Sequence, residues 1–266
     1  MAVTGLPVVP DRELGQHFLV DENILGVIER LACLEPGDVV LEVGPGLGAL
    51  TAFLAARVAH VHAVEIDRAL EPHLRARLGT ASNVSIHLGD ALVLDLAALS
   101  PPASSLVSNL PYAIATPLVV ESLDRLPALR RWCVMVQREV ADRFFAAPGT
   151  KAYGAVSVLV QLATERTGIH PVARTVFRPR PNVDSALVAF RRKGAFAAPD
   201  ELKRLVVAAF AHRRKTLPNS VELAGLASRS RAARALEAIG RRPEARAESL
   251  APEEFLGLAA ALGPEP

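Results

Sequence analysis

Residues 39–48 read Val39-Val40-Leu41-Glu42-Val43-Gly44-Pro45-Gly46-Leu47-Gly48, a short apolar run that closes in three glycines spaced two apart. An apolar run of this length predicts a fully buried strand, and the apolar spacing of 49–58 predicts a helix directly after it. The glycines therefore lie at a strand-to-helix turn, where glycine lets the backbone approach a ligand closely. Because the helix start presents unpaired N–H groups and the positive end of its dipole, we expect a nucleotide-like ligand.

Outward from this turn, strands alternate with helices along the chain. Strands are predicted at 60–65, 84–88, 105–108 and 132–137. Helices are predicted at 24–34, 67–78, 138–146 and 153–164, with a further helix that Thr116 caps and Pro117 begins. This alternation predicts an α/β fold with a mostly parallel, doubly wound sheet.

The pattern changes after His170. Residues 185–190 read as a late strand, which predicts a hairpin at the edge of the sheet. Beyond Pro199 only helical periodicity remains, at 202–210, 230–239 and 252–262. We therefore expect two domains, 1–194 and 195–266, with a boundary near Gly194.

Composition indicates a globular chain of 266 residues, because half of its residues are hydrophobic and only 22% are charged. No apolar run reaches the roughly 18 residues of a membrane span, and the N-terminus does not read as a signal peptide. Cys33 and Cys133 form no CxxC pair, so we expect reduced thiols and a cytoplasmic protein. The seven histidines show no metal-ligand spacing, so no metal is expected.

Charge is unevenly distributed. Residues 191–246 hold fourteen Lys or Arg and five Asp or Glu, a net charge of +9, so the rest of the chain carries −7 against a total of +2. Asymmetry of this kind indicates a polyanionic partner for the C-terminal part. The alternative is an arginine-rich helix surface that is simply solvated.

Polar or glycine-rich sequence follows four of the predicted strands: 44–48, Glu65, Asp90 and Asn109. In an open α/β sheet, ligands bind at the carboxyl ends of the strands. Glu65 lies about twenty residues beyond the glycines, where a carboxylate accepts both ribose hydroxyls. Asp90 could accept an exocyclic amine of adenine. The structural alternatives are a solvated charge for Glu65 and a turn cap for Asp90.

Asn109-Leu110-Pro111-Tyr112 is the most specific of these segments. As a structural element it could be an ordinary turn. As a catalytic element, the Asn oxygen and a backbone carbonyl would accept both N–H groups of an adenine amine and draw its lone pair out of conjugation. Proline would stiffen the loop, and Tyr112 would offer a face for an extruded base. A sulfonium methyl donor then needs in-line placement and a dry pocket, with no acid or base.

With these residues in view, the chain resembles the KsgA/RsmA family of ribosomal RNA adenine dimethyltransferases, and the matches run nearly end to end. The motifs that carry the resemblance are Gly15-Gln16-His17-Phe18-Leu19, Glu42 to Gly48, Glu65-Ile66-Asp67, Gly89-Asp90-Ala91, Asn109 to Tyr112, Gln137 to Ala141, Tyr153-Gly154, Phe177 to Ser185 and Arg213 to Leu217.

The resemblance implies a Rossmann-like sheet that uses S-adenosylmethionine, a small helical C-terminal domain that binds RNA, and two methyl transfers to N6 of adjacent adenosines in the small ribosomal subunit. It implies a monomer that acts on the small subunit and its rRNA. Carried over by position, the cofactor contacts are His17, Leu19, Gly44, Gly46, Glu65, Asp90 and Asn109. The target adenine is held by Asn109, Leu110, Pro111 and Tyr112.

Two departures from the family pattern bear on function. His17 stands where many members have Asn, so its cofactor contact becomes an imidazole or is made by the backbone. Residues 11–14 read Asp11-Arg12-Glu13-Leu14 where relatives often have a basic cluster, which leaves an RNA-binding N-terminal arm in doubt.

RNA-binding residues are expected in the basic C-terminal part, at Arg213, Arg214 and Lys215, together with Arg229, Arg231 and Arg234. Phosphate contacts of this kind make binding sensitive to salt. The structural alternative is that some of these arginines cover carbonyl groups at the C-termini of helices.

Three rival functions remain open from sequence. An erythromycin-resistance-type enzyme would methylate large-subunit RNA, and Tyr153-Gly154, Arg213 to Leu217 and residues 248–255 favour the small-subunit enzyme instead. A nicotinamide-dependent oxidoreductase would need a GxGxxG motif and leaves the Asn109 loop unexplained. A catalytically idle assembly factor would not need intact motifs.

Overall fold

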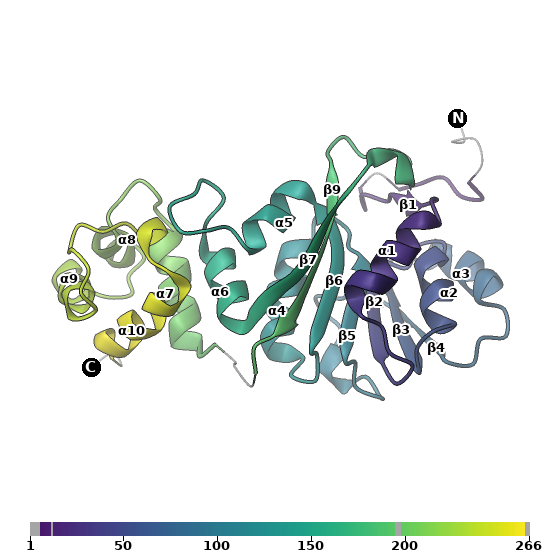
Figure 1. The fold of residues 1–266 in the computed structure, drawn as a ribbon, viewed down its shortest axis with the longest axis horizontal. Coiled ribbons are helices and arrows are strands. Elements are labelled where there is room, and N and C mark those ends of the chain that lie inside the picture. Colours follow the sequence, from purple (N-terminus) through teal and green to yellow (C-terminus); the bar gives the residue numbers. More distant parts are fainter. Residues whose placement is uncertain (1–5, 12, 195–197, 264–266) are drawn as a thin grey trace. The chain divides into compact units, whose positions relative to one another are not determined.

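The computed structural model describes residues 6–11, 13–194 and 198–263 and divides the chain into two compact units. The sheet unit comprises the chain up to Ala141 and Glu165–Arg192, and the helical unit comprises Asp142–Thr164 and the chain from Lys193 onward (Figure 1). Arg12, in the segment that departs from the family pattern, and 195–197, at the start of the second predicted domain, lie outside the described residues.

The predicted division at 194 differs from these units by two residues at the boundary, which lies before Lys193, and in one longer segment. Asp142–Thr164 belongs with the C-terminal helices, because α6 (Ala155–Ala163) is apolar almost all round and packs against α7 (Asp200–Phe210) and α10 (Pro252–Leu262). A helix that is apolar all round must be covered on more than one side. The sequence pattern marks this helix but does not reveal which helices cover it.

A seven-stranded sheet in the order β4-β3-β2-β5-β6-β9-β7 confirms the Rossmann-like α/β prediction. Its strands are β2 (Val39–Val43), β3 (His60–Glu65), β4 (Val84–Leu88), β5 (Ser105–Asn109), β6 (Arg131–Gln137), β7 (Thr164–Val172) and β9 (Ser185–Arg192). The pairs β2–β3, β3–β4, β2–β5 and β5–β6 are parallel, whereas β9 runs antiparallel to β6 with Gln137 opposite Ser185. The carboxyl ends of the parallel strands therefore gather at one edge.

Strand β7 was not predicted from the sequence. Its residues read Thr-Glu-Arg-Thr-Gly-Ile-His-Pro-Val, and most of them are exposed because β7 forms the edge of the sheet beside β9. An edge strand needs no apolar alternation and tolerates proline, so the usual signal is missing. The late strand β9 and its place near the sheet edge are confirmed.

Helices cover both faces of the sheet. Helices α1 (Asn23–Ala32) and α2 (Ala49–Ala55) pack on one face through a core that includes Ile28, Leu54 and Val40. On the other face, the indole Nε1–H of Trp132 donates to Ser122 of α4 (Ala115–Arg125) over 2.9 Å. Helix α3 (Glu71–Leu78), preceded by a short 3-10 turn, follows β3.

The predicted start of α4 is wrong. The helix begins at Ala115, so Thr116 lies inside its first turn and is not a cap. The backbone N–H groups of Ile114 and Ala115 both donate to the carbonyl of Pro111, which starts the turn before Thr116 is reached. Pro117 still lies among the first four residues, whose N–H groups have no partner within a helix.

The helical unit contains the end of α5 (Arg138–Phe144) from Asp142 onward, with α6, α7, α8 (Leu217–Leu223), α9 (Arg229–Ala238) and α10. Its centre is Tyr153, which is fully buried and donates its hydroxyl to the carbonyl of Leu250 over 2.8 Å. Helix α10 begins at Pro252, as predicted, whereas the seven-residue α8 is not predicted because it is too short for periodicity to show. None of the described helices is long and apolar enough to cross a membrane.

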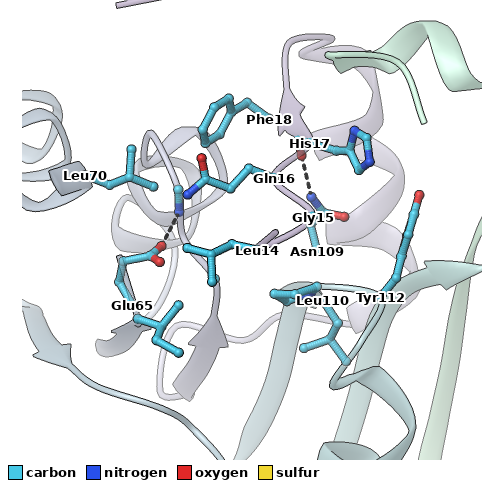
Figure 2. Close-up of a pocket in the computed structure, with 14 residues that line it drawn as sticks. Leu14, Gly15, Gln16, His17, Phe18, Glu65, Leu70, Asn109, Leu110 and Tyr112 are labelled. Carbon is cyan, nitrogen blue, oxygen red and sulfur yellow. Dashed lines mark hydrogen bonds between the residues drawn. The ribbon is translucent and has the colours of Figure 1, made fainter. Parts of the chain in front are cut away.

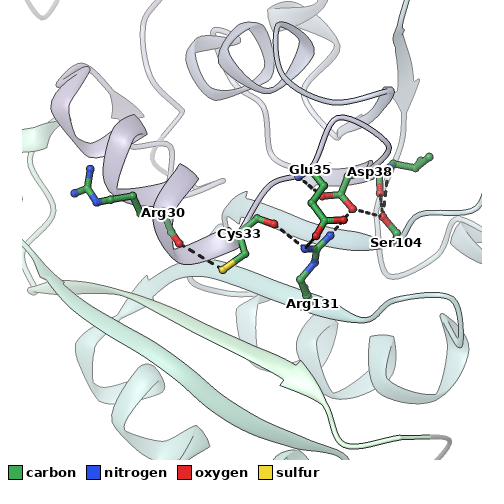
Figure 3. A network of polar contacts seen from close by, with 7 residues as sticks. Arg30, Cys33, Glu35, Asp38, Ser104 and Arg131 are labelled. Carbon is green, nitrogen blue, oxygen red and sulfur yellow. Dashed lines mark hydrogen bonds and ion pairs between the residues drawn. The ribbon is translucent and has the colours of Figure 1, made fainter.

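A polar network at the amino ends of β2 and β6 ties the end of α1 to the sheet (Figure 3). The guanidinium of Arg131 forms an ion pair with Asp38 and donates to the carbonyl of Cys33 over 2.6 Å. The second carboxylate oxygen of Asp38 accepts the N–H of Glu35 at 2.8 Å. Because Asp38 is only 5% exposed, its charge depends on these partners.

Replacing Arg131 with alanine is expected to lower the free energy of unfolding by about 3 kcal/mol, because it leaves the buried carboxylate of Asp38 without its positively charged partner. Urea unfolding at pH 7 measures the change. The matched control is Arg125→Ala, which removes an exposed pair with Glu121 and should cost about 0.5 kcal/mol or less. Equal losses for the two variants would show that the network adds no stability.

Candidate active site

A pocket of about 510 Å³ lies where the carboxyl ends of β2, β3 and β5 meet the N-terminal segment 14–18 (Figure 2). Three chain segments converge on it: the N-terminal segment, the glycine turn with the end of β3, and the loop after β5. The lining residues are Leu14, Gly15, Gln16, His17, Phe18, Gly44, Gly46, Glu65, Ile66, Leu70, Asn109, Leu110, Pro111 and Tyr112. The strand ends predicted to form a site are thus brought together for three of four segments.

Gly44 and Gly46 have the left-handed conformation at the turn after β2, with φ of 75° and 56°. A Cβ atom on Gly44 would lie 3.1 Å from the ring of Pro111, and one on Gly46 would lie 2.9 Å from the ring of Phe18. Glycine is therefore required here for two reasons, backbone conformation and close approach. The N-terminal segment and the loop after β5 both pack directly against this turn.

The carboxylate of Glu65 faces the pocket from the end of β3. Its oxygens accept the N–H groups of Gly46 and Asp67, each over 3.0 Å, which fixes the carboxylate in place. Burial raises the pKa of Glu65, and the two backbone N–H groups offset part of that rise. A carboxylate oxygen can accept more than one hydrogen bond, so Glu65 can still receive ligand hydroxyl groups.

Asn109 ends β5 and is held by the N-terminal segment. Its Nδ2 donates to the backbone carbonyl of His17 over 3.2 Å, which leaves Oδ1 as the acceptor of the same amide. The next N–H, that of Leu110, donates to the carbonyl of Met135 over 3.1 Å, and the Leu110 side chain is buried. The first half of the loop is therefore anchored at both of its residues.

Tyr112 and His17 stand beside Asn109 in the pocket, with ring centroids 5.7 Å apart. The hydroxyl of Tyr112 shares a 2.7 Å hydrogen bond with Ser185, and burial raises the pKa of Tyr112. Nδ1 of His17 lies 2.8 Å from the carbonyl of Pro179. Because a carbonyl oxygen can only accept a hydrogen bond, Nδ1 is the donor in this contact, and Nε2 is the ring nitrogen that does not take part in it.

His17 is thus engaged twice, by its backbone carbonyl to Asn109 and by its ring to Pro179. The short sheet formed by β1 (Phe18–Leu19) and β8 (Phe177–Arg178) holds the same segment in place. Leu19 does not line the main pocket. It lines an adjoining hollow of about 330 Å³ together with His17, Gly44 and Asn109.

Asp90 is the predicted cofactor residue that lines neither this pocket nor the adjoining hollow. Its Oδ1 accepts the N–H of Leu92 over 2.9 Å, which is the turn-capping role that the sequence left as the alternative. Arg213, Arg214 and Lys215 belong to the helical unit, where all three are exposed.

Sequence reasoning missed several lining residues. Gln16 donates from Nε2 to the carboxylate of Asp67 over 2.7 Å and so ties the N-terminal segment to the end of β3. Phe18, Ile66 and Leu70 contribute apolar surface. Gln16 and Phe18 lie inside a motif that was noted, but only the fold shows that their side chains reach the pocket.

Glu42 lines the adjoining hollow and is 1% exposed. No described residue offers its Oε2 a hydrogen bond. Burial raises the pKa of Glu42 to about 8, and the nearby carboxylate of Glu65 adds to the rise. The signal in the sequence was a single charged residue inside an otherwise apolar strand.

Comparison with known proteins points to one family. Residues 11–262 match the profile of the family described as ribosomal RNA adenine dimethylase. The chain is 48% identical over 266 residues to "Ribosomal RNA small subunit methyltransferase A" of Rubrobacter xylanophilus, covering 99% of each chain. It is 42% identical to the protein of the same name from Moorella thermoacetica, covering 96% and 93%.

Two solved structures share the fold over nearly the whole chain. A dimethyladenosine transferase from Plasmodium falciparum aligns with a TM-score of 0.76 and 26% identity, covering 91% of this chain and 96% of that one. The 23S rRNA methyltransferase ErmE aligns with a TM-score of 0.68 and 27% identity, covering 92% and 99%. The profile match over nearly all of its length shows that this chain belongs to the ribosomal RNA adenine dimethylase family.

Proposed function

We propose that this protein transfers methyl groups from S-adenosylmethionine to N6 of two adjacent adenosines in the rRNA of the small ribosomal subunit. The observation that carries the proposal is the convergence of Asn109 and Tyr112 with the glycine turn and Glu65 in one pocket. A nucleotide-type donor and an extruded base require these two groups of residues in the same place.

The residues present fit S-adenosylmethionine, which when bound supplies an electrophilic sulfonium methyl group. Gly44 and Gly46 line the pocket with backbone atoms alone, and their lack of side chains lets Pro111 and Phe18 pack against the turn. The fixed carboxylate of Glu65 suits a ribose with two hydroxyl groups. Asp90 stays a candidate for binding the amine of the cofactor adenine. Leu19 stays a candidate cofactor contact, from the adjoining hollow.

Asn109 carries the proposed chemistry. Because its Nδ2 is committed to the His17 carbonyl, Oδ1 is oriented to accept an N–H of the target amine. Accepting that N–H would localise the nitrogen lone pair for in-line attack on the methyl carbon. The methyl–sulfur bond would break with its electron pair left on sulfur, which gives S-adenosylhomocysteine, and the methylated nitrogen would lose one proton. The stacking face is Tyr112, and the buried surroundings of Leu110 and the ring of Pro111 exclude water.

RNA binding is proposed for the exposed basic residues of the helical unit. Arg214 and Lys215 are exposed, whereas Arg213 lies 3.5 Å from the carboxylate of Glu248 and donates to the carbonyl of Lys151. Arg231 donates to the carbonyls of Leu262 and Gly263 at the end of α10, which is the structural alternative for this arginine. Arg214 and Lys215 are therefore the better candidates for phosphate contacts. We further propose that the protein acts as a cytoplasmic monomer.

A second candidate function is methylation of large-subunit rRNA, which the similarity to the ErmE structure supports. The small-subunit proposal is favoured because relatives with 42–48% identity over the whole chain carry the small-subunit name.

A methyl-transfer assay on isolated small and large ribosomal subunits, taken from a strain that lacks the enzyme, distinguishes the two candidate functions. We expect labelled methyl groups from S-adenosylmethionine to enter small-subunit rRNA, and mass spectrometry to find dimethylated adenosines there. Transfer to the large subunit alone would establish the second candidate. Binding without transfer to either subunit would point to an assembly factor, and calorimetric binding of NAD instead of S-adenosylhomocysteine would point to an oxidoreductase.

A further inference from the structure

The hydroxyl of Tyr112 is bound by a group that belongs to the sheet and not to the loop that carries the tyrosine. The partner is Ser185, whose Oγ lies 2.7 Å from the tyrosine hydroxyl. Ser185 is the first residue of β9, is 1% exposed, and pairs in register with Gln137 of β6. The position of its hydroxyl is therefore fixed by the strand ladder.

This contact constrains the orientation of the Tyr112 ring. A tyrosine side chain rotates about two single bonds, and Tyr112 is only half-buried. Burial raises the pKa of Tyr112, so its hydroxyl keeps its proton and can donate to Ser185 at neutral pH. With the hydroxyl held at one end and the loop at the other, the position and direction of the ring's long axis are determined.

The strand itself does not require a hydroxyl at this position. Backbone groups make the pairing of β9 with β6, and residues 186–190 of β9 are small or apolar and buried. Ser105 offers a comparison, because it is likewise the first residue of a strand (β5) and is fully buried, yet no described residue bonds its hydroxyl. The hydroxyl of Ser185 differs in being directed to a residue of the pocket.

We propose that Ser185 is a positioning residue that holds the Tyr112 ring at the place where the target adenine stacks. The inference rests on the proposed function. Stacking depends on the relative orientation of the two rings, and a base that is tilted or displaced by about 1 Å no longer presents N6 in line with the methyl donor. Ser185 does not line the pocket and acts through Tyr112.

The test is a double-mutant cycle with Ser185→Ala, Tyr112→Phe and the double variant. Each single variant removes the same hydrogen bond, so we expect each to lower kcat for small-subunit methylation by about 3- to 10-fold. The double variant should be no slower than either single one. KM for the subunit and Kd for S-adenosylhomocysteine should stay within about twofold of wild type. Subunit binding depends on RNA contacts outside the pocket, and cofactor binding depends on pocket residues other than Tyr112.

The matched control is Ser105→Ala, which removes a buried hydroxyl at the start of another strand and should leave kcat unchanged. Effects of Ser185→Ala and Tyr112→Phe that multiply in the double variant would overturn the inference, as would a wild-type kcat in either single variant. If Ser185→Ala fails to fold, Tyr112→Phe removes the bond without touching the sheet and carries the test alone.

Failure of the proposed function is distinguishable from failure of this inference. Wild-type protein that transfers no methyl groups to small subunits would refute the function and the positioning role together. Active wild-type protein with independent effects of the two substitutions would refute the positioning role only.

Discussion

Asn109→Ala is expected to lower the rate of methyl transfer by about 10²- to 10³-fold, the loss typical of removing one preorganised hydrogen-bonding group at a reacting centre. The substitution removes Oδ1, the proposed acceptor for the adenine amine, and also the Nδ2 donor to the His17 carbonyl. Binding to the small subunit should change little, because the proposed phosphate contacts are made by exposed basic residues of the helical unit and not by Asn109. Single-turnover methylation and a subunit-binding assay measure the two quantities.

Asn109→Asp separates the two roles of this side chain. Aspartate keeps an oxygen acceptor but cannot donate to the His17 carbonyl, so the methylation rate should also fall. The matched control is Asn83→Ala, which removes an asparagine that donates to the carbonyls of Ala55 and Val58 away from the pocket. That variant should lose stability and keep its rate. An unaltered rate in Asn109→Ala would remove the mechanism proposed here.

Glu42 is expected to make the stability of the protein fall as pH rises. Burial raises the pKa of Glu42 from the ordinary 4.5 to about 8 in the folded state. Below pH 4.5 the carboxyl is neutral in both states and contributes nothing. Between pH 4.5 and 8 the unfolded chain loses this proton while the folded chain keeps it, so folding becomes less favourable by up to about 5 kcal/mol.

Glu42→Gln should remove this contribution. The difference in unfolding free energy between Glu42→Gln and wild type, measured by urea unfolding at several pH values, should grow in favour of the variant from pH 4.5 to 8 and level off above. The control is Glu121→Gln on α4, which makes the same substitution at an exposed carboxylate paired with Arg125. Parallel curves for Glu42→Gln and wild type would contradict the buried, proton-bearing carboxyl.

Residue patterns alone were sufficient for much of this molecule. The apolar run 39–43 with its three glycines determined a buried strand and a strand-to-helix turn, because few residues other than glycine adopt the φ angles of Gly44 and Gly46. Strand β4 was recognisable because Val84, Ile86 and Leu88 alternate with polar residues, which is the period of a strand. The loop from Asn109 to Tyr112 was recognisable because each of its residue types has a use in binding an adenine.

Only the tertiary structure decided the rest. Strand β7 carries no apolar signal because an edge strand is exposed, and Asp142–Thr164 joins the helical unit through contacts far apart in sequence. The bond from Asn109 to the His17 carbonyl spans 92 positions, and that from Tyr112 to Ser185 spans 73. Local sequence encodes which residues can form a turn or a strand. The partner of a buried polar group depends on tertiary packing, and these partners orient the Asn109 and Tyr112 side chains in the pocket.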